Sequence, residues 1–142
     1  MEYFDAAIRV RYAETDKMGV SYYGNYFTWF EVGRNEYFRA LNLPYTIYEK
    51  QSIYLPVGEA YCRYYKPLTY DDYVIIRTGI TLLKQSSMKF TYNVYKKSDK
   101  ELVAEGHTTH IFVDANMKPC RIPDSIKENV TLIKEFPPYK PS

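Results

Sequence analysis

One carboxylate, Asp16, precedes the predicted start of a long helix. It lies in the segment T-D-K-M-G-V-S-Y-Y-G-N-Y, which spans residues 15–26. A carboxylate can act as a base or a nucleophile, and the free backbone N–H groups of a helix N-terminus can stabilise negative charge on a carbonyl oxygen. Acyl transfer uses both kinds of group. Gly19 permits the tight turn that would bring them together.

The same residues also have purely structural interpretations. An Asp that shortly precedes a glycine is usually a turn residue. Ser21 or Asn25 could be no more than a cap for the helix that follows. From this segment alone, acyl chemistry and simple turn formation both stay open.

The histidines predict no metal site. His107 and His110 are three residues apart on a predicted strand, so their side chains point to opposite faces of a sheet. No H-x-x-x-H motif or cysteine pair accompanies them, and the chain has neither a G-x-S-x-G motif nor a glycine-rich phosphate loop. We expect both histidines to be hydrogen-bonded parts of the scaffold.

The composition is typical of one globular domain. The chain has 142 residues, of which 46% are hydrophobic and 25% charged, so we expect a single domain over residues 1–142. Its 17 tyrosines suggest half-buried strands, interfaces and a roomy pocket. The net charge of +2, with Lys and Arg spread along the chain, argues against a nucleic-acid partner.

The sequence indicates a reducing compartment. Cys62 and Cys120 are far apart and form no disulfide framework. The acidic N-terminus lacks the apolar region of a signal peptide, and no apolar run approaches about 18 residues. We therefore expect a cytoplasmic protein without a membrane span.

Hydrophobic periodicity predicts an α+β fold. A strand over residues 4–13 would place Ile8, Val10 and Tyr12 on one face. A helix over 25–42 is followed by a loop over 44–52, and then by further elements. These are strands over 57–65, 73–83, 88–95 and 102–113, a short helix over 123–130, and an irregular tail over 135–142. One long helix beside a run of antiparallel strands predicts a sheet wrapped around that helix.

Strand alternation also predicts which side chains share a face. In the strand over 73–83, Val74, Ile76, Ile80 and Leu82 would all face the same side. In the next strand, the corresponding residues are Met88, Phe90, Tyr92 and Val94.

Three segments resemble a known family. Residues 9–37, R-V-R-Y-A-E-T-D-K-M-G-V-S-Y-Y-G-N-Y-F-T-W-F-E-V-G-R-N-E-Y, are similar to the signature D-x-x-G-[IV]-[VS]-x-[HY]-x-N-Y followed by W-F-E-x-x-R. That signature belongs to hotdog-fold acyl-CoA thioesterases of the 4-hydroxybenzoyl-CoA thioesterase and YbgC-like family. The resemblance continues through residues 59–72 and 104–114, and covers Ile8 to about Pro123.

The resemblance implies a fold and a catalytic site. The fold would be a hotdog that forms a homodimer or homotetramer, with the active site at the dimer interface. Asp16 matches the catalytic carboxylate, acting as nucleophile or general base. Tyr23 and Gly24 match the start of the helix whose N–H groups polarise the thioester carbonyl. Many YbgC-like members have His where this chain has Tyr23, so a His-assisted mechanism is not expected.

The resemblance also implies substrate contacts. Tyr22 and Tyr26 would contact the substrate, and Leu55, Pro56 and Val57 would line its acyl pocket. The CoA portion would contact Lys84, Ser86, Ser87 and Lys89, although the same segment could be a solvated hairpin. Glu31 is expected to be a structural partner of Arg34 or of a backbone group rather than a second acid.

The expected activity is hydrolysis of an acyl-CoA to a free acid and CoA, without a metal or other cofactor. Two alternatives stay open: a thioesterase for acyl groups on a carrier protein, and a hotdog module that binds an acyl ligand without turnover. The sequence does not identify the acyl group.

Overall fold

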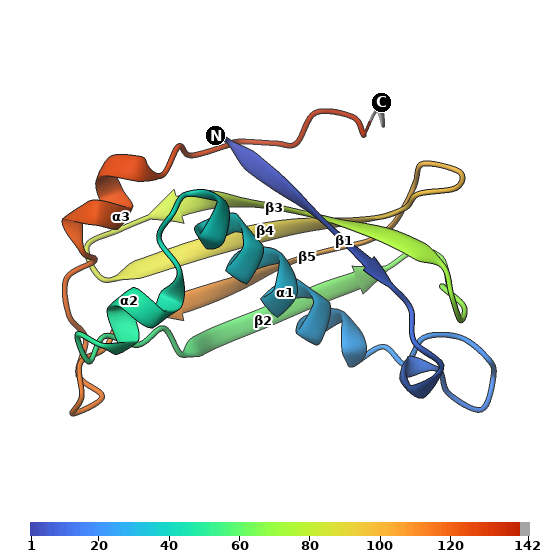
Figure 1. Ribbon diagram of the computed structural model, residues 1–142, viewed down its shortest axis with the longest axis horizontal. Helices are drawn as coiled ribbons and strands as arrows, with labels where there is room; N and C mark the ends of the chain where they lie inside the picture. The colour runs from blue at the N-terminus through green and yellow to red at the C-terminus, as the bar shows by residue number, and fades with distance from the viewer. Residues whose placement is uncertain (140–142) are drawn as a thin grey trace.

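The computed structural model describes residues 1–139 and has the predicted α+β architecture (Figure 1). Five antiparallel strands form one sheet in the order β1-β3-β4-β5-β2. The strands are β1 (Tyr3–Arg9), β2 (Val57–Tyr64), β3 (Tyr73–Leu83), β4 (Ser87–Lys96) and β5 (Glu101–Ile111). The helices are η1 (Tyr12–Glu14), α1 (Asn25–Ala40), α2 (Tyr45–Glu49) and α3 (Asp124–Asn129).

Most predicted elements are confirmed, and three details are wrong. The first strand ends at Arg9, because the chain turns into η1, and Tyr12 is 77% exposed instead of sharing a buried face. The loop predicted over 44–52 contains α2. Leu82 is exposed because the pairing of β3 with β4 shifts between Ile80 and Leu82, and this irregularity ends the alternation.

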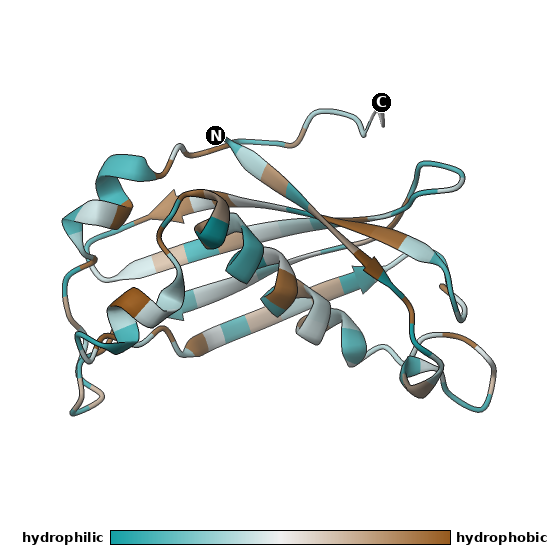
Figure 2. Ribbon diagram, in the orientation of Figure 1, coloured by the Kyte–Doolittle hydropathy of each residue, from teal (hydrophilic) through white to brown (hydrophobic). Residues whose placement is uncertain are grey.

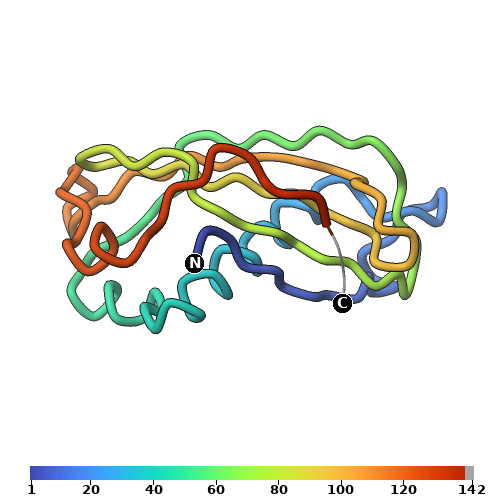
Figure 3. The backbone as a smooth tube through the Cα atoms, turned by 90° about the horizontal axis from the view of Figure 1, so that it is seen from above, coloured from blue at the N-terminus to red at the C-terminus, as the bar shows by residue number. Residues whose placement is uncertain are grey.

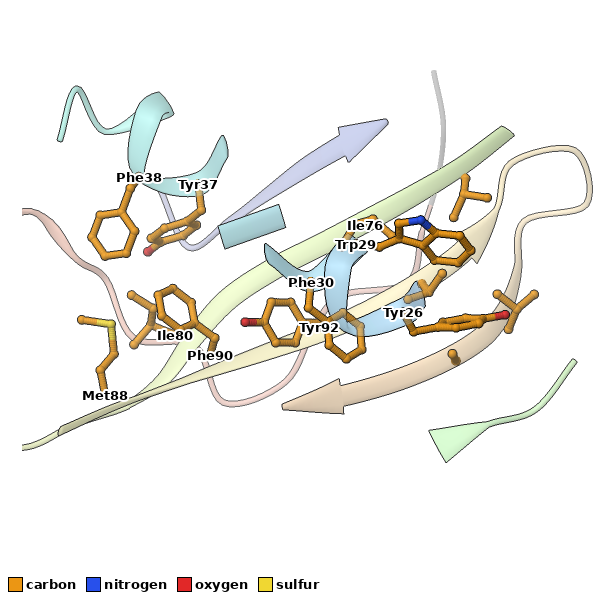
Figure 4. Close-up of a cluster of buried hydrophobic side chains, with 14 of the residues drawn as sticks. Tyr26, Trp29, Phe30, Tyr37, Phe38, Ile76, Ile80, Met88, Phe90 and Tyr92 are labelled. Atoms are coloured by element: carbon orange, nitrogen blue, oxygen red, sulfur yellow. The ribbon is translucent and has the colours of Figure 1, made fainter. Parts of the chain in front are cut away.

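The core lies between α1 and one face of the sheet. Hydrophobic and hydrophilic residues alternate along the elements (Figure 2), and the predicted face of β4 is fully buried. Side chains of α1 meet this face (Figure 4), where the ring of Phe30 stacks on Tyr92 with centroids 4.2 Å apart and planes 4° apart. The aromatic load of α1 is therefore used mainly for packing.

The C-terminal segment packs on the other face of the sheet. Ile76 and Thr78 face α1, so Arg77 between them points away from it. The Arg77 guanidinium donates to both carboxylate oxygens of Asp5 and to the carbonyl of Pro137. The segment after α3 runs lengthwise along the molecule (Figure 3) and is irregular over the described part of the predicted tail. Residues 140–142 of that tail lie outside the described residues.

Gly33 sets the distance between α1 and β3. A Cβ atom at this position would collide with Oγ1 of Thr78 and lie 2.9 Å from Cγ2 of Ile76. The helix can approach the sheet this closely only because residue 33 has no side chain.

Replacing Gly33 with Ala tests this close approach. Ala is the better helix former by about 1 kcal/mol, but overpacking a core destabilises by about 1–3 kcal/mol. We expect Gly33→Ala to lower the free energy of unfolding by up to about 2 kcal/mol in urea titrations, from the balance of these two effects. Gly58→Ala is the control, since its added Cβ would lie 3.7 Å from the nearest heavy atom. A more stable Gly33→Ala variant would contradict the packing described here.

Candidate active site

Asp16 lies on an exposed turn before α1. Its N–H donates to the Val20 carbonyl at 2.8 Å, its carbonyl accepts from Gly19 at 3.0 Å, and its Oδ1 accepts the Met18 N–H at 2.8 Å. Gly19 has a φ of +81°, which glycine adopts readily. The turn interpretation is thus correct, yet within residues 1–139 no hydrogen bond engages Oδ2 of Asp16. The carboxylate is oriented through one oxygen and accessible through the other.

The start of α1 presents two free N–H groups. Tyr22 donates to the Glu14 carbonyl at 2.8 Å, and Asn25 donates to the Tyr22 carbonyl at 3.0 Å. Between them, the N–H groups of Tyr23 and Gly24 donate to no acceptor within the described part of the chain. The helix has no side-chain cap, so the cap interpretation of Ser21 and Asn25 is wrong.

Glu14 joins the Asp16 turn to α1. Its side chain is buried, where Oε2 accepts the indole N–H of Trp29 at 2.9 Å and Oε1 accepts the Arg11 N–H at 2.8 Å. Its carbonyl also accepts the side-chain amide of Asn25 at 2.7 Å. The sequence analysis missed this residue. Its signal was a glutamate two positions before Asp16 together with a tryptophan in the following helix, which can donate a hydrogen bond to it.

Tyrosines surround the helix start. The rings of Tyr22 and Tyr23 lie 4.5 Å apart and are both exposed. The Tyr64 hydroxyl, from the end of β2, donates to the Tyr23 carbonyl at 2.8 Å. Tyr26, predicted to contact substrate, is only 2% exposed and packs on Trp29. In a single chain, Tyr26 therefore contributes to the core beneath the helix start.

The other predicted substrate contacts lie at the opposite end of β2. Leu55, Pro56 and Val57 lead into this strand, whereas Tyr64 beside the helix start ends it. Seven residue steps at about 3.3 Å separate the two ends by roughly 23 Å. One chain therefore does not bring Leu55, Pro56 and Val57 to Asp16.

The predicted CoA contacts also lie at that far end. The Lys84 N–H donates to the Ser87 carbonyl at 2.9 Å in the turn between β3 and β4, and Ser86 accepts from Phe112 at 2.8 Å. Ser87 pairs with Ile111, which is next to the pairing of Val57 with His110. Lys89 pairs with Thr109 on the face away from α1. The residues predicted to contact the acyl group and CoA are thus grouped together, away from Asp16 of the same chain.

A pocket of about 370 Å³ lies between α1 and α2. Glu31, Arg34 and Asn35 line it from α1, Tyr45 lines it from α2, and Leu55 closes it before β2. Glu31 makes no ion pair with Arg34 within residues 1–139, so the expected partnership of these two side chains is not found there.

A buried hydrogen-bond chain links two walls of this pocket. Arg34 Nη1 lies 3.4 Å from the Tyr92 hydroxyl, which lies 2.6 Å from the Thr108 hydroxyl. The Thr108 hydroxyl lies 2.8 Å from Nε2 of His110, whose Nδ1 lies 3.0 Å from the Leu55 carbonyl. Arginine only donates and a carbonyl only accepts. Each group in this hydrogen-bond chain therefore donates in the direction from Arg34 toward Leu55. The ring proton of His110 is accordingly on Nδ1.

The two histidines do point to opposite faces, as predicted. His110 is buried against the core side of the sheet. On the other face, His107 stacks on Tyr61 and lies 3.1 Å from a carboxylate oxygen of Glu59. Within residues 1–139, no three His, Cys, Asp or Glu side chains are grouped to hold a metal ion.

Comparison with known proteins decides the family. A sequence model described as the thioesterase-like superfamily matches residues 10–130. The chain belongs to this superfamily. It is 36% identical over 107 residues to the putative acyl-CoA thioesterase YneP of Bacillus subtilis, covering 75% of this chain and 77% of the relative. It is 30% identical over 120 residues to the acyl-CoA thioester hydrolase YbgC of Escherichia coli, covering 84% and 89%.

A solved structure agrees with this assignment. The DHNA-CoA thioesterase of Staphylococcus aureus superposes with a TM-score of 0.82 at 38% identity, covering 85% of this chain and 81% of that one. The resemblance to hotdog thioesterases is therefore confirmed, as is the assignment to thioester hydrolases. None of the described helices is long and apolar enough to span a membrane.

The buried hydrogen-bond chain makes the folding stability of this thioesterase depend on pH. Burial lowers the pKa of His110 from 6.5 to about 4, and the nearby charge of Arg34 lowers it further, while the hydrogen bond to the Leu55 carbonyl opposes this. As the pH falls below 6.5, the unfolded chain binds the proton before the folded chain does. At about 1.4 kcal/mol per pH unit, the loss of stability reaches about 3 kcal/mol near pH 4.

This loss can be assigned to one histidine by equilibrium unfolding between pH 7 and pH 4. We expect the wild type and His107→Gln to lose stability in parallel, and His110→Gln to lose about 3 kcal/mol less over the same range, since burial keeps His110 unprotonated in the folded chain. Equal pH slopes in both variants would show that His110 does not fold in its neutral form.

Proposed function

We propose that this protein hydrolyses an acyl-CoA thioester to a free carboxylic acid and CoA. The observation that supports it most directly is the placement of the Asp16 carboxylate on a turn joined to the start of α1, where Tyr23 and Gly24 have free N–H groups. A thioester needs little more than these two groups, because its carbonyl is a good electrophile and its thiolate a fair leaving group. The relatives named as acyl-CoA thioesterases agree with this reaction.

In the proposed reaction, the thioester carbonyl oxygen accepts hydrogen bonds from Tyr23 and Gly24. The negative charge that develops on this oxygen is then stabilised by N–H groups already in position. Asp16 attacks the carbonyl carbon and expels CoA as a thiolate, and water hydrolyses the resulting anhydride. Alternatively, Asp16 removes a proton from a water that attacks directly. Both routes need no cofactor beyond the CoA of the substrate.

We propose further that the active site is completed by a second copy of the chain along β2. The Tyr65 N–H donates to Val103 of β5 at 2.8 Å, and backbone groups alternate in direction along a strand. The backbone groups of Ala60, Cys62 and Tyr64 therefore point outward from the sheet edge. Tyr61, Tyr64 and Tyr65 are 39–45% exposed along this edge. An unprotected edge with large aromatic side chains favours pairing with another chain.

A two-fold axis across β2 accounts for the separation of the predicted contacts. Antiparallel pairing of two β2 strands places the start of one beside the end of the other. Leu55, Pro56 and Val57 of one chain then lie near Tyr23 of the second chain, and the turn that contains Lys84 lies at the same end. Each of two equivalent sites would use Asp16 from one chain and acyl and CoA contacts from the other.

The central test replaces Asp16 with Asn, which keeps the shape but removes the charge. CoA release from short, long and aromatic acyl-CoAs should fall by at least about 100-fold, by analogy with the loss of an oxyanion donor. Acyl-CoA binding should be retained. Asp124→Asn, on the exposed side of α3, is the matched control and should keep full activity. Unchanged turnover in Asp16→Asn would remove Asp16 from catalysis.

The same panel separates the alternatives. Turnover of carrier-protein-bound acyl groups alone would favour a carrier-protein thioesterase. Tight acyl-CoA binding by the wild type without any turnover would favour a binding module.

Assembly along β2 is tested at Ala60. Proline there removes an outward N–H group and leaves the hydrogen bonds to β5 in place, because those come from the alternate residues. At a concentration where light scattering gives the wild type twice the chain mass of 16.8 kDa, we expect Ala60→Pro to be monomeric. We also expect at least a tenfold loss of turnover. Ala60→Ser keeps the N–H and should match the wild type. A dimeric Ala60→Pro variant would place the interface elsewhere.

A further inference from the structure

The pocket between α1 and α2 contains hydrogen-bond donors that lack acceptors. Arg34 is half-buried, and no carboxylate within residues 1–139 lies within 4.0 Å of its guanidinium. Its side chain makes one long hydrogen bond of 3.4 Å, to Tyr92, and this bond uses one of five N–H groups. A guanidinium presents its N–H groups as a planar fork that matches a carboxylate. The remaining donors of Arg34 are thus available to an anionic oxygen.

A second donor in the same pocket lacks an acceptor. The Tyr45 hydroxyl is buried and donates its proton to no acceptor among the described residues. Burial raises the pKa of Tyr45 above its ordinary value, although the positive charge of the neighbouring Arg34 and the donor groups that it directs at this hydroxyl oppose the rise. The hydroxyl therefore keeps its proton at neutral pH. A buried donor without an acceptor is unfavourable, and an acceptor from a ligand would relieve this.

We propose that this pocket binds a carboxylate at the far end of the acyl group, with Arg34 and Tyr45 as its hydrogen-bond donors. The inference rests on the proposed thioesterase function and narrows its substrate class to acyl groups with a second acidic group. The volume of about 370 Å³ leaves room for a short or aromatic acyl group between the two helices.

One wall of the pocket lies where such an acyl group would arrive. Leu55 lines the pocket and lies just before β2. In the proposed pairing of two β2 strands, this end of one chain lies beside the helix start of the other. A thioester carbonyl held by Tyr23 and Gly24 of the second chain would then direct its acyl group toward Arg34 and Tyr45 of the first.

The charges at the pocket favour this ligand despite two carboxylates on its wall. Glu31 and Glu49 are both exposed, so water screens their charges. Arg39 also lines the pocket, but its guanidinium is paired with Glu36, so Arg34 is the cation available to the carboxylate of a ligand. Arg34 is oriented from behind by the Tyr92 and Thr108 hydroxyls, which are themselves fixed by His110. A preset donor loses less freedom on binding than a mobile surface arginine.

Two acyl-CoAs of equal shape test the carboxylate preference. Glutaryl-CoA has a terminal carboxylate, and 5-methylhexanoyl-CoA has an isopropyl group of similar shape in its place. For the wild type, we expect a kcat/KM at least tenfold higher with glutaryl-CoA. This preference should fall at least tenfold in Arg34→Gln and about threefold in Tyr45→Phe. In both variants, turnover of 5-methylhexanoyl-CoA should stay within threefold of the wild type. Arg121→Gln, whose side chain is 70% exposed, is the control and should keep the preference.

A binding measurement keeps the pocket testable if no acyl-CoA is hydrolysed. Benzoate and the neutral benzyl alcohol are titrated into wild-type protein while the ring signals of Tyr45 are followed by NMR. Benzoate should shift these signals saturably in the wild type and not in Arg34→Gln, and benzyl alcohol should leave them unchanged. Melting temperatures establish that each variant is folded.

The outcomes separate the pocket from the thioesterase function. Benzoate binding at Tyr45 without turnover of any acyl-CoA would support the carboxylate site and overturn the proposed reaction. Turnover with equal rates for both acyl-CoAs, and no response of Tyr45 to benzoate, would overturn the carboxylate site alone. A preference for hydroxylated over carboxylated acyl groups would also overturn it.

Discussion

The buried carboxylate of Glu14 is the contact on which the candidate active site depends. It accepts hydrogen bonds from the Trp29 indole and the Arg11 backbone, while the carbonyl of the same residue holds Tyr22 and Asn25. Hydrogen bonds to a charged group contribute about 1.5–3 kcal/mol each, and a buried carboxylate without them would be strongly destabilising. The chain therefore has little freedom in how it leaves η1 and enters α1. The Asp16 turn lies between these two fixed points, so its position follows from the burial of a neighbouring acid.

Periodicity predicted the fold because each long element buries one regular face. In β4 the buried residues alternate from Met88 to Val94, and the expected face was correct over this stretch. The prediction failed where a local irregularity breaks the period, as at the shifted pairing before Leu82 and at η1 after Arg9. The short helix α2 has too few residues for a period to emerge from the sequence.

Less of the candidate site could be predicted, because its parts come from distant segments. The Asp16 turn and the helix start are contiguous in sequence, and the hydrogen bond from the Tyr22 N–H to the Glu14 carbonyl joins them. The contact between Glu14 and Trp29 spans 15 residues, and that between Arg34 and Tyr92 spans 58. No periodicity encodes such contacts, since they depend on how α1 crosses the sheet. The proposed role of Arg34 likewise depends on Tyr45 and Leu55, which line the same pocket but lie in other segments of the chain.

The residues proposed to carry out the reaction and the residues proposed to select the acyl group lie in separate parts of the fold. Asp16 is on an exposed turn that one buried glutamate anchors, whereas Arg34 is supported by hydroxyl and imidazole groups on the central strands β4 and β5. The hydrogen-bond chain behind Arg34 has one proton order because a donor-only group starts it and an acceptor-only group ends it. Reversing any of its bonds would leave a buried donor facing another donor, which makes the arrangement rigid. A rigid wall suits discrimination between acyl groups, and its residues can change without altering the turn that carries Asp16. Relatives that share the turn and the helix start can therefore differ in the acyl groups they accept.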